Sequence, residues 1–267
     1  MAKQAAGPIQ VQGKLGDIIY TRAGKYGSTL RKAVKAGTKK EEQALKDQYS
    51  RTRYLNALAS DINRIIAAHS EGLKSGQFYV ELQRRMRREP LNHRLLLLRN
   101  LRGLEVNARY PFSGQGITLI KATPERKGLR VLVQVQLKPL QKKMPVDSYC
   151  YEVLAATWTK KEGAVDVEQQ FSTWVLLSEG RPEFDFFFPK QQSALHWLVA
   201  IRIRLGKEGI PYPHSQCDGM LIADSGSFDP GEQLWLQKRE GQAKKKEIKT
   251  VEPVPRAIAR VKPKRFD

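Results

Sequence analysis

Four guanidinium groups fall within five residues of this sequence, at Arg84-Arg85-Met86-Arg87-Arg88. Arginine presents its donors in a planar fork that suits bidentate contact with phosphate. If the segment ends a helix, the helix dipole also favours cations there, although four of them exceed what that effect requires. We interpret the cluster as a contact for phosphates or for an acidic partner, with helix capping as the alternative.

Two further segments concentrate basic residues, as phosphate-binding surfaces do. The first lies near the N-terminus and contains Lys14, Arg22, Lys25, Arg31, Lys32 and Lys35, together with Tyr26. The second lies near the C-terminus and contains Lys244, Lys245, Lys246, Lys262, Lys264 and Arg265. Tyr26 is interleaved with cations, as in base-stacking platforms. These residues and the cluster at 84–88 are the predicted nucleic-acid-binding residues.

The charge of the chain is unevenly distributed. Its 267 residues include 47 Lys+Arg and 27 Asp+Glu, for a net charge of +20. Residues 1–103 contain 21 basic and 8 acidic side chains, residues 104–233 contain 15 of each, and residues 234–267 contain 11 and 4. The excess therefore lies at the two ends. It indicates an acidic partner, either nucleic acid (DNA or RNA) or an acidic protein surface.

Motifs for catalysis or cofactor binding are missing from the sequence. The third glycine of a dinucleotide fingerprint does not follow Gly114-Gln115-Gly116, and there is no Walker lysine pattern. No histidine has a partner at metal-ligand spacing. His214 and Cys217 lie near a predicted loop without a nucleophile elbow, and Glu183 and Asp185 fit a solvated strand face. We therefore predict a protein that is not an enzyme and binds no metal or cofactor.

The N-terminal cations fall on a predicted β-hairpin. Strands are expected at 18–22 and 28–32, and Gly24 and Gly27 give the turn its backbone freedom. An isolated two-stranded hairpin is marginal in water, so this one must pack on another element or become ordered on binding. Residues 1–12 are expected to be flexible.

A long amphipathic helix is expected at about 40–69. Thr38 and Glu41 match a capping box at its start. Its apolar stripe contains Leu45, Tyr49, Thr52, Leu55, Leu58 or Ala59, Ile62, Ile65 and Ile66. We expect this stripe to face the core, with the seam of a homo-oligomer as the alternative.

Two shorter helices are expected to follow. One spans 76–89 and ends before Pro90, so the cluster at 84–88 would form its last turn. The other spans 94–102 and ends at Gly103, a plausible helix-terminating glycine.

From about residue 104 the apolar pattern has a period of two. Val131, Val133 and Val135 alternate along a strand expected at 129–137. Further strands are expected at 117–122, 149–158, 167–177, 184–188, 196–205 and 220–223. Short strands separated by turn residues predict an antiparallel β-sandwich of immunoglobulin-like size.

The C-terminal residues carry many cations and three prolines, which predicts a disordered basic tail. The expected fold is therefore α+β, in four parts. These are a basic N-terminal arm with the hairpin at 1–37, a three-helix region at 38–103, the β-sandwich domain at 104–236 and the tail at 237–267.

The sequence indicates a cytoplasmic protein that does not enter a membrane. It contains neither a signal-peptide h-region nor an apolar stretch of membrane-spanning length. Cys150 and Cys217 are too few for a disulfide framework. We expect free buried thiols, with pairing of the two cysteines as the alternative.

Two short motifs resemble those of a family of uncharacterised Bacteroidota proteins. They are Gly13-Lys14-Leu15-Gly16-Asp17-Ile18-Ile19-Tyr20 with Gly24-Lys25-Tyr26, and Leu101-Arg102-Gly103-Leu104-Glu105-Val106-Asn107. The resemblance implies a hairpin, a helical segment and a transition into a β domain, and it supplies no settled activity. This chain departs from the family at Leu104 and Val106, where aromatic residues are expected, and in its basic tail.

Three functions fit the sequence. The first is a non-enzymatic nucleic-acid-binding protein that contacts phosphates with little sequence specificity and has a neutral β domain as its body. The second is a structural subunit of a phage-like or other large assembly, whose basic arms contact acidic neighbours or a packaged genome. The third is an enzyme whose site in the β domain leaves no sequence motif.

Overall fold

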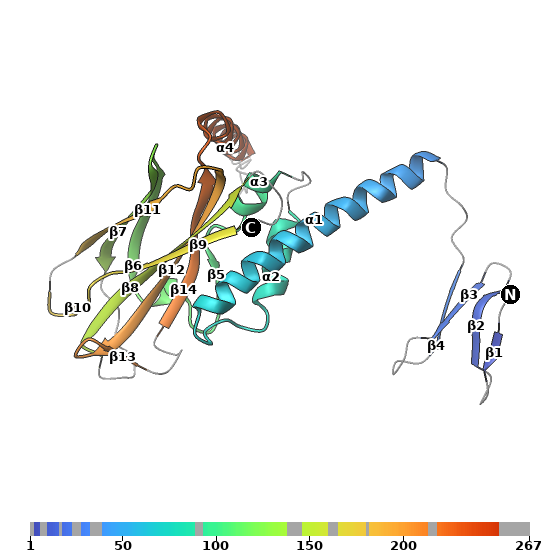
Figure 1. Cartoon of the computed structure of the whole chain (residues 1–267), viewed down its shortest axis with the longest axis horizontal. Helices are drawn as coiled ribbons and strands as arrows, with labels where there is room; N and C mark the ends of the chain where they lie inside the picture. Colours follow the sequence, from blue (N-terminus) through green and yellow to red (C-terminus); the bar gives the residue numbers. More distant parts are fainter. Residues whose placement is uncertain are drawn as a thin grey trace, which may run out of the picture. The chain divides into compact units, whose positions relative to one another are not determined.

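A computed structural model gives the structure of the chain (Figure 1). It describes the strands at 3–5, 10–15, 18–22 and 28–32 and the residues 39–88, 93–137, 146–159, 165–179, 182–212 and 218–250. The chain divides into two compact units, Met1–Tyr54 and Leu55–Asp267. Helices occur together with antiparallel sheets, which confirms the α+β class.

The first unit contains a four-stranded antiparallel sheet in the order β1-β2-β3-β4. Its strands are β1 (Lys3–Ala5), β2 (Gln10–Leu15), β3 (Ile18–Arg22) and β4 (Ser28–Lys32). The last two have the predicted bounds. Within the segment 1–12 that is expected to be flexible, residues 3–5 lie on β1 and residues 10–12 on β2. Leu15 pairs with Ile18, so two residues connect β2 to β3, a length that favours hairpins.

Helix α1 (Lys39–His69) starts one residue before its predicted position. Its apolar stripe is buried at Leu58, Ala59, Ile62, Ile65 and Ile66. Leu45 and Tyr49 are instead 51% and 74% exposed, so the prediction that they face a core is wrong. All side chains from Gln43 to Arg53 are exposed, and a stripe is buried only where another element covers it.

Helices α2 (Phe78–Met86) and α3 (Arg94–Arg99) are shorter than predicted. Phe78, Leu82 and Met86 of α2 are buried at four-residue spacing, which places them on one face. The leucines of α3 are buried at 95–98. The predicted helix-ending residue Gly103 has a φ of 72°, a conformation that glycine adopts without strain.

The second unit contains a larger sheet with the strand order β10-β8-β12-β14-β5, in which β9 also pairs with β8 and β13 with β12. Its strands are β5 (Leu104–Glu105), β8 (Ser148–Thr159), β9 (Val165–Phe171), β10 (Val175–Leu176), β12 (Ala194–Lys207), β13 (Ile210–Pro211) and β14 (Asp218–Ser227). All of these pairs are antiparallel. The single strand predicted at 167–177 is two strands, β9 and β10, separated by residues 172–174; the backbone N–H of Tyr151 donates to the side-chain Oγ of Ser172 there.

A smaller antiparallel sheet has the order β11-β7-β6. It consists of β6 (Ile117–Pro124), β7 (Gly128–Leu137) and β11 (Glu183–Pro189), and a short 3-10 helix η2 (Phe112–Gly114) precedes β6. The predicted inward alternation of β7 is confirmed, since Val131, Val133 and Val135 are all buried.

One hydrophobic core joins the two sheets of the second unit. Val133 and Phe186 of the smaller sheet belong to the same buried cluster as Val153 and Ile201 of the larger one. The β strands of the second unit therefore form a single body.

The structure divides the chain at a different place from the predicted boundary at residues 103 and 104. β5 pairs with β14, and α3 also contacts β14, so the helical segment from Leu55 onward belongs to the β unit. The predicted boundary followed the change in charge, which reflects the surface and not the packing.

Helix α4 (Pro230–Thr250) occupies the start of the predicted tail at 237–267. The prediction of a disordered tail is therefore wrong for 237–250, which are helical. Leu236 packs with Leu95 and Leu96 of α3, which fixes the beginning of α4. The residues after it are mainly Lys, Glu, Gln and Ala, which favour helix without needing a core. The remaining part, 251–267, lies outside the described residues.

Candidate nucleic-acid interface

Helix α2 and the residues after it present the predicted arginine cluster. Arg84 is 66% exposed, and its Nε lies 2.8 Å from Oε2 of Glu81. The hydrogen bond from Arg84 lowers the pKa of Glu81, so that carboxylate stays charged and offsets part of the arginine charge. Arg87 and Arg88 are exposed, and neither forms an ion pair with a residue in the described part of the chain. Arg87 and Arg88 are therefore the cations of the cluster that remain available to a partner.

Arg85 is engaged in the fold. Its Nη1 donates to the carbonyl oxygen of Arg102 at 3.1 Å, and its Nε lies 3.5 Å from Glu81. Arg102 is itself 52% exposed, with its Nε 3.9 Å from Asp224. We call the exposed set Arg84, Arg87, Arg88 and Arg102 the α2 basic patch. Arg102 joins the patch through folding, because it lies beyond α3 in the sequence.

Some of the predicted residues at the two ends of the chain lie on the strands of the first unit or on α4. Lys14 lies on β2, Arg22 on β3, and Arg31 and Lys32 on β4. Residues 244–246 lie on α4. The side chains of all these residues lie outside the described part, as do Lys25, Tyr26, Lys35, Lys262, Lys264 and Arg265. Their role in binding stays a prediction.

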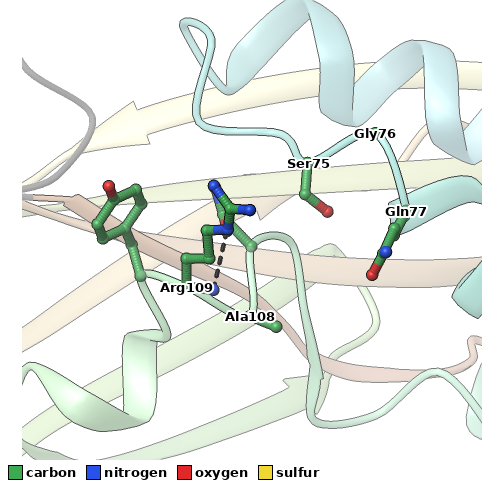
Figure 2. A pocket seen from close by; sticks show the side chains of 7 residues that line it. Ser75, Gly76, Gln77, Ala108 and Arg109 are labelled. Atoms are coloured by element: carbon green, nitrogen blue, oxygen red, sulfur yellow. Dashed lines mark hydrogen bonds between the residues drawn. The ribbon is translucent and has the colours of Figure 1, made fainter.

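A pocket of about 370 Å³ opens at the other end of α2 (Figure 2). Residues 75–77, just before the helix, form one wall, and residues 107–110 form the other. Figure 2 shows the side chain of Arg109 extending between the walls toward Ser75, with Gln77 farther along the same wall as Ser75. No acidic residue lines this pocket, so Arg109 gives it a positive charge.

Hydrogen bonds hold the two walls of the pocket together. Nδ2 of Asn107 donates to the carbonyl oxygen of Leu73 at 2.7 Å, and the backbone N–H of Ser75 donates to Val106 at 3.3 Å. Oδ1 of Asn107 accepts the backbone N–H of Arg109 at 2.9 Å, an Asx-type turn. The backbone of the pocket is therefore fixed before any ligand arrives.

This pocket could not be predicted from the sequence, because its walls are separated by about thirty residues and share no motif. The local signal was Asn107 two residues before Arg109, a spacing that favours a turn. Nothing in that signal indicates which segment lies opposite.

A buried ion cluster centred on Arg202 is a second feature that no sequence motif indicates. Arg202 of β12 is 2% exposed; its Nη1 lies 3.4 Å from Oε2 of Glu152, and its Nη2 donates to Oδ2 of Asp218. Strand register brings the three together, because Arg202 pairs with Glu152 of β8 and Arg204 pairs with Asp218 of β14. The available signal was the presence of Glu152, Arg202 and Asp218 next to apolar residues in three strands.

The turn after α1 completes the cluster. Oε2 of Glu71 lies 3.3 Å from Nη2 of Arg202 and 2.9 Å from Nη2 of Arg204. His69 Nδ1 lies 2.7 Å from Oε1 of Gln169, and Nε2 of that glutamine donates to Glu152 at 2.6 Å. These contacts fasten the end of α1 to the larger sheet.

Burial dominates the electrostatics of this cluster. It raises the pKa of Glu152 and of Asp218, although Arg202 acts in the opposite direction on both. Paired charges at this depth, between a helix end and a sheet, have a structural role. We therefore place the candidate interface at α2 and not here.

A histidine contact holds the start of α4. Nε2 of His196 on β12 lies 2.9 Å from Oε2 of Glu232, and the ring of His93 lies against that of Trp235 with 5.2 Å between centroids. Burial lowers the pKa of His196, although Glu232 raises it. The contact joins α4 to the sheet.

The structure accounts for the other polar residues considered in the sequence. Asp185 accepts a hydrogen bond from Arg130 at 2.8 Å, and Glu183 accepts one from Gln134 at 2.8 Å, as expected of a solvated strand face. Cys150 is free and buried. Residues 213–217, which include His214 and Cys217, lie outside the described residues.

The described residues contain neither a candidate metal site nor a helix that could span a membrane. No group of three or more His, Cys, Asp or Glu side chains is placed to hold a metal ion. Among the helices in the described part of the chain, none is long and apolar enough to cross a membrane.

Comparison of the chain with protein-family models, curated proteins and solved structures finds no match. The resemblance to the Bacteroidota family therefore stays a prediction.

Proposed function

We propose that this protein is a non-enzymatic nucleic-acid-binding protein that contacts phosphates with little sequence specificity. The observation that carries the proposal is the α2 basic patch, in which Arg87 and Arg88 are exposed and unpaired among the described residues. Exposed arginines without acidic partners release counterions from nucleic acid when they bind phosphate. The same cations inside ion pairs would contribute little.

The cations at the two ends of the chain would extend this contact. Residues 1–103 and 234–267 together hold the whole excess of positive charge, and the middle of the chain has none. Charge concentrated in this way attracts a polyanion from a distance and is screened by salt.

The β strands of the second unit would serve as a neutral body. We propose that the two sheets form an antiparallel sandwich of immunoglobulin-like size, which their shared core supports. The role of this body would be to hold α2 and the adjacent pocket in fixed positions, and this role requires no binding site in the strands themselves.

Fluorescence anisotropy across a salt series tests the proposal. Full-length protein is titrated into labelled duplex DNA, single-stranded DNA and RNA, and the matched control is a peptide nucleic acid of the same sequence, which has bases but no phosphates. We expect affinity to fall steeply with salt, by on the order of a thousandfold between 50 and 200 mM if about six phosphates are contacted. We expect no binding to the control. Absence of binding to all three nucleic acids at low salt would contradict the proposal.

The second candidate function is a structural subunit of a phage-like or other large assembly. The observation in its favour is the exposed half of α1, where Leu45 and Tyr49 continue an apolar stripe that is buried farther along the helix. Sedimentation velocity of nucleic-acid-free protein tests it. A defined large species that dissociates in the Tyr49→Ser variant supports an assembly. A monomer at all concentrations excludes self-assembly through this stripe.

A further inference from the structure

We propose that the pocket at 75–77 and 107–110 binds one unpaired nucleotide, so that the protein prefers single-stranded over duplex nucleic acid. This inference rests on the proposed nucleic-acid binding and adds a substrate class to it. The pocket lies at the N-terminal end of α2 and the α2 basic patch at its C-terminal end, both in the second unit of the chain.

Size is the first argument. A volume of about 370 Å³ is at the lower end of the range of roughly 300–1,000 Å³ found for small-molecule sites. It suits a single nucleotide and not a longer segment. The walls are held together by the Asn107 and Ser75 hydrogen bonds, so the pocket does not have to form on binding.

The lining chemistry is the second argument. Arg109 is exposed, and its guanidinium forms no hydrogen bond or ion pair with another described residue, so all its donors are available to a phosphate. Tyr110 contributes a half-buried aromatic ring, the group on which unpaired bases stack. Ser75 and Gln77 offer a hydroxyl and an amide, which can both donate to and accept from a base edge.

The position of the pocket is the third argument. Gln77 at the pocket and Arg87 in the patch flank α2 on its two sides and are ten residues apart, roughly 15 Å at a helical rise of about 1.5 Å per residue. A strand with one nucleotide in the pocket can therefore bring neighbouring phosphates to the patch. In a duplex the bases are stacked inside the helix and cannot enter the pocket, so only the patch would be engaged.

The test compares a labelled single strand of about 12 nucleotides with a duplex of the same length, both with full-length protein at one salt concentration. Tyr110→Ala should weaken single-strand binding by about tenfold and leave duplex binding unchanged, because base stacking is lost. Tyr110→Phe should retain single-strand binding, since it keeps the ring. The matched control is Phe171→Ala, which removes an exposed aromatic residue from β9.

Arg109→Ala provides an independent readout. It should lower the slope of log affinity against log salt for the single strand by about 0.7, the value for one lost phosphate contact. Arg126→Ala, an exposed arginine between β6 and β7, is the charge-matched control and should not change the slope. Thymidine monophosphate should compete with the strand, whereas inorganic phosphate at equal ionic strength should not; competition by both alike would show a phosphate site without a base.

The outcomes separate the two proposals. A single-strand preference that Tyr110→Ala abolishes supports the pocket. Equal binding of single strand and duplex, both indifferent to Tyr110→Ala, overturns the pocket and leaves phosphate-directed binding intact. Absence of binding to either at low salt overturns both proposals.

Discussion

We expect substitution of the buried Arg202 to lower the free energy of unfolding strongly. Arg202→Ala would leave Glu152 and Asp218 buried without their shared cation. Removing one partner of a buried ion pair costs about 3–5 kcal/mol of unfolding free energy, and we expect a loss in that range. Urea unfolding at neutral pH measures it.

Lys207 on the same strand provides the control for Arg202. Its side chain is 57% exposed, so Lys207→Ala should change the free energy of unfolding by less than about 0.5 kcal/mol. Similar losses for the two variants would contradict a structural role for the buried cluster.

The Cys150 thiol should be inert in the folded protein. Burial raises the pKa of Cys150 to about 11, and the thiolate is the reactive form. In a Cys217→Ser background, which leaves one thiol, we expect no reaction with a disulfide reagent at about pH 8 until denaturant is added. Rapid reaction of the native protein would show that β8 opens or that the thiol is accessible.

His196 should make stability depend on pH below neutrality. Burial lowers the pKa of His196, so at a given pH below neutrality His196 is protonated to a greater extent in the unfolded chain than in the folded chain. Stability should therefore fall as the pH drops through the ordinary histidine pKa of about 6.5 toward the lowered value. The glutamine of His196→Gln does not titrate, so the unfolding free energy of this variant should fall less over the same pH interval. Parallel curves of unfolding free energy against pH for the variant and the wild type would show that His196 does not cause the pH dependence.

Helix α1 should respond differently to mutation along its length. Ile62→Ala removes a fully buried side chain and should lower the unfolding free energy by about 2–5 kcal/mol. Leu45→Ala lies on the same stripe but is exposed, so the expected change is below about 0.5 kcal/mol. Chemical denaturation of dilute protein checks both, and a large effect of Leu45→Ala would show that another part of the chain covers it.

The elements show what local pattern can and cannot predict. The period of the apolar residues was enough to place α1 and β7 within one or two residues of their observed bounds. It could not show that Leu45 is uncovered, because that depends on which element packs alongside. Likewise, α4 was not predicted because its cationic half has helix-forming residues but no apolar stripe. The start of α4 is held by Leu236, which packs against α3.

At the scale of the molecule, the position of the charged clusters could be predicted from the sequence, but the contacts between distant segments could not. The location of the arginine cluster followed directly from the sequence, since exposed cations need no partner to be recognised. Arg102 in the patch, the two walls of the pocket and the partners of Arg202 depend on contacts between distant segments. Such contacts are set by sheet register and helix packing, which a single sequence does not specify.

The salt dependence of duplex binding tests the central claim, that exposed cations of the α2 basic patch bind phosphate. Arg87→Ala/Arg88→Ala is compared with Arg126→Ala/Lys127→Ala, which removes two exposed charges from the turn between β6 and β7. Each lost phosphate contact reduces the slope of log affinity against log salt by about 0.9, so we predict a reduction of about 1.8 for the first variant and none for the second. Equal slopes for the two variants and the wild type would contradict the account, because binding would then not pass through this patch.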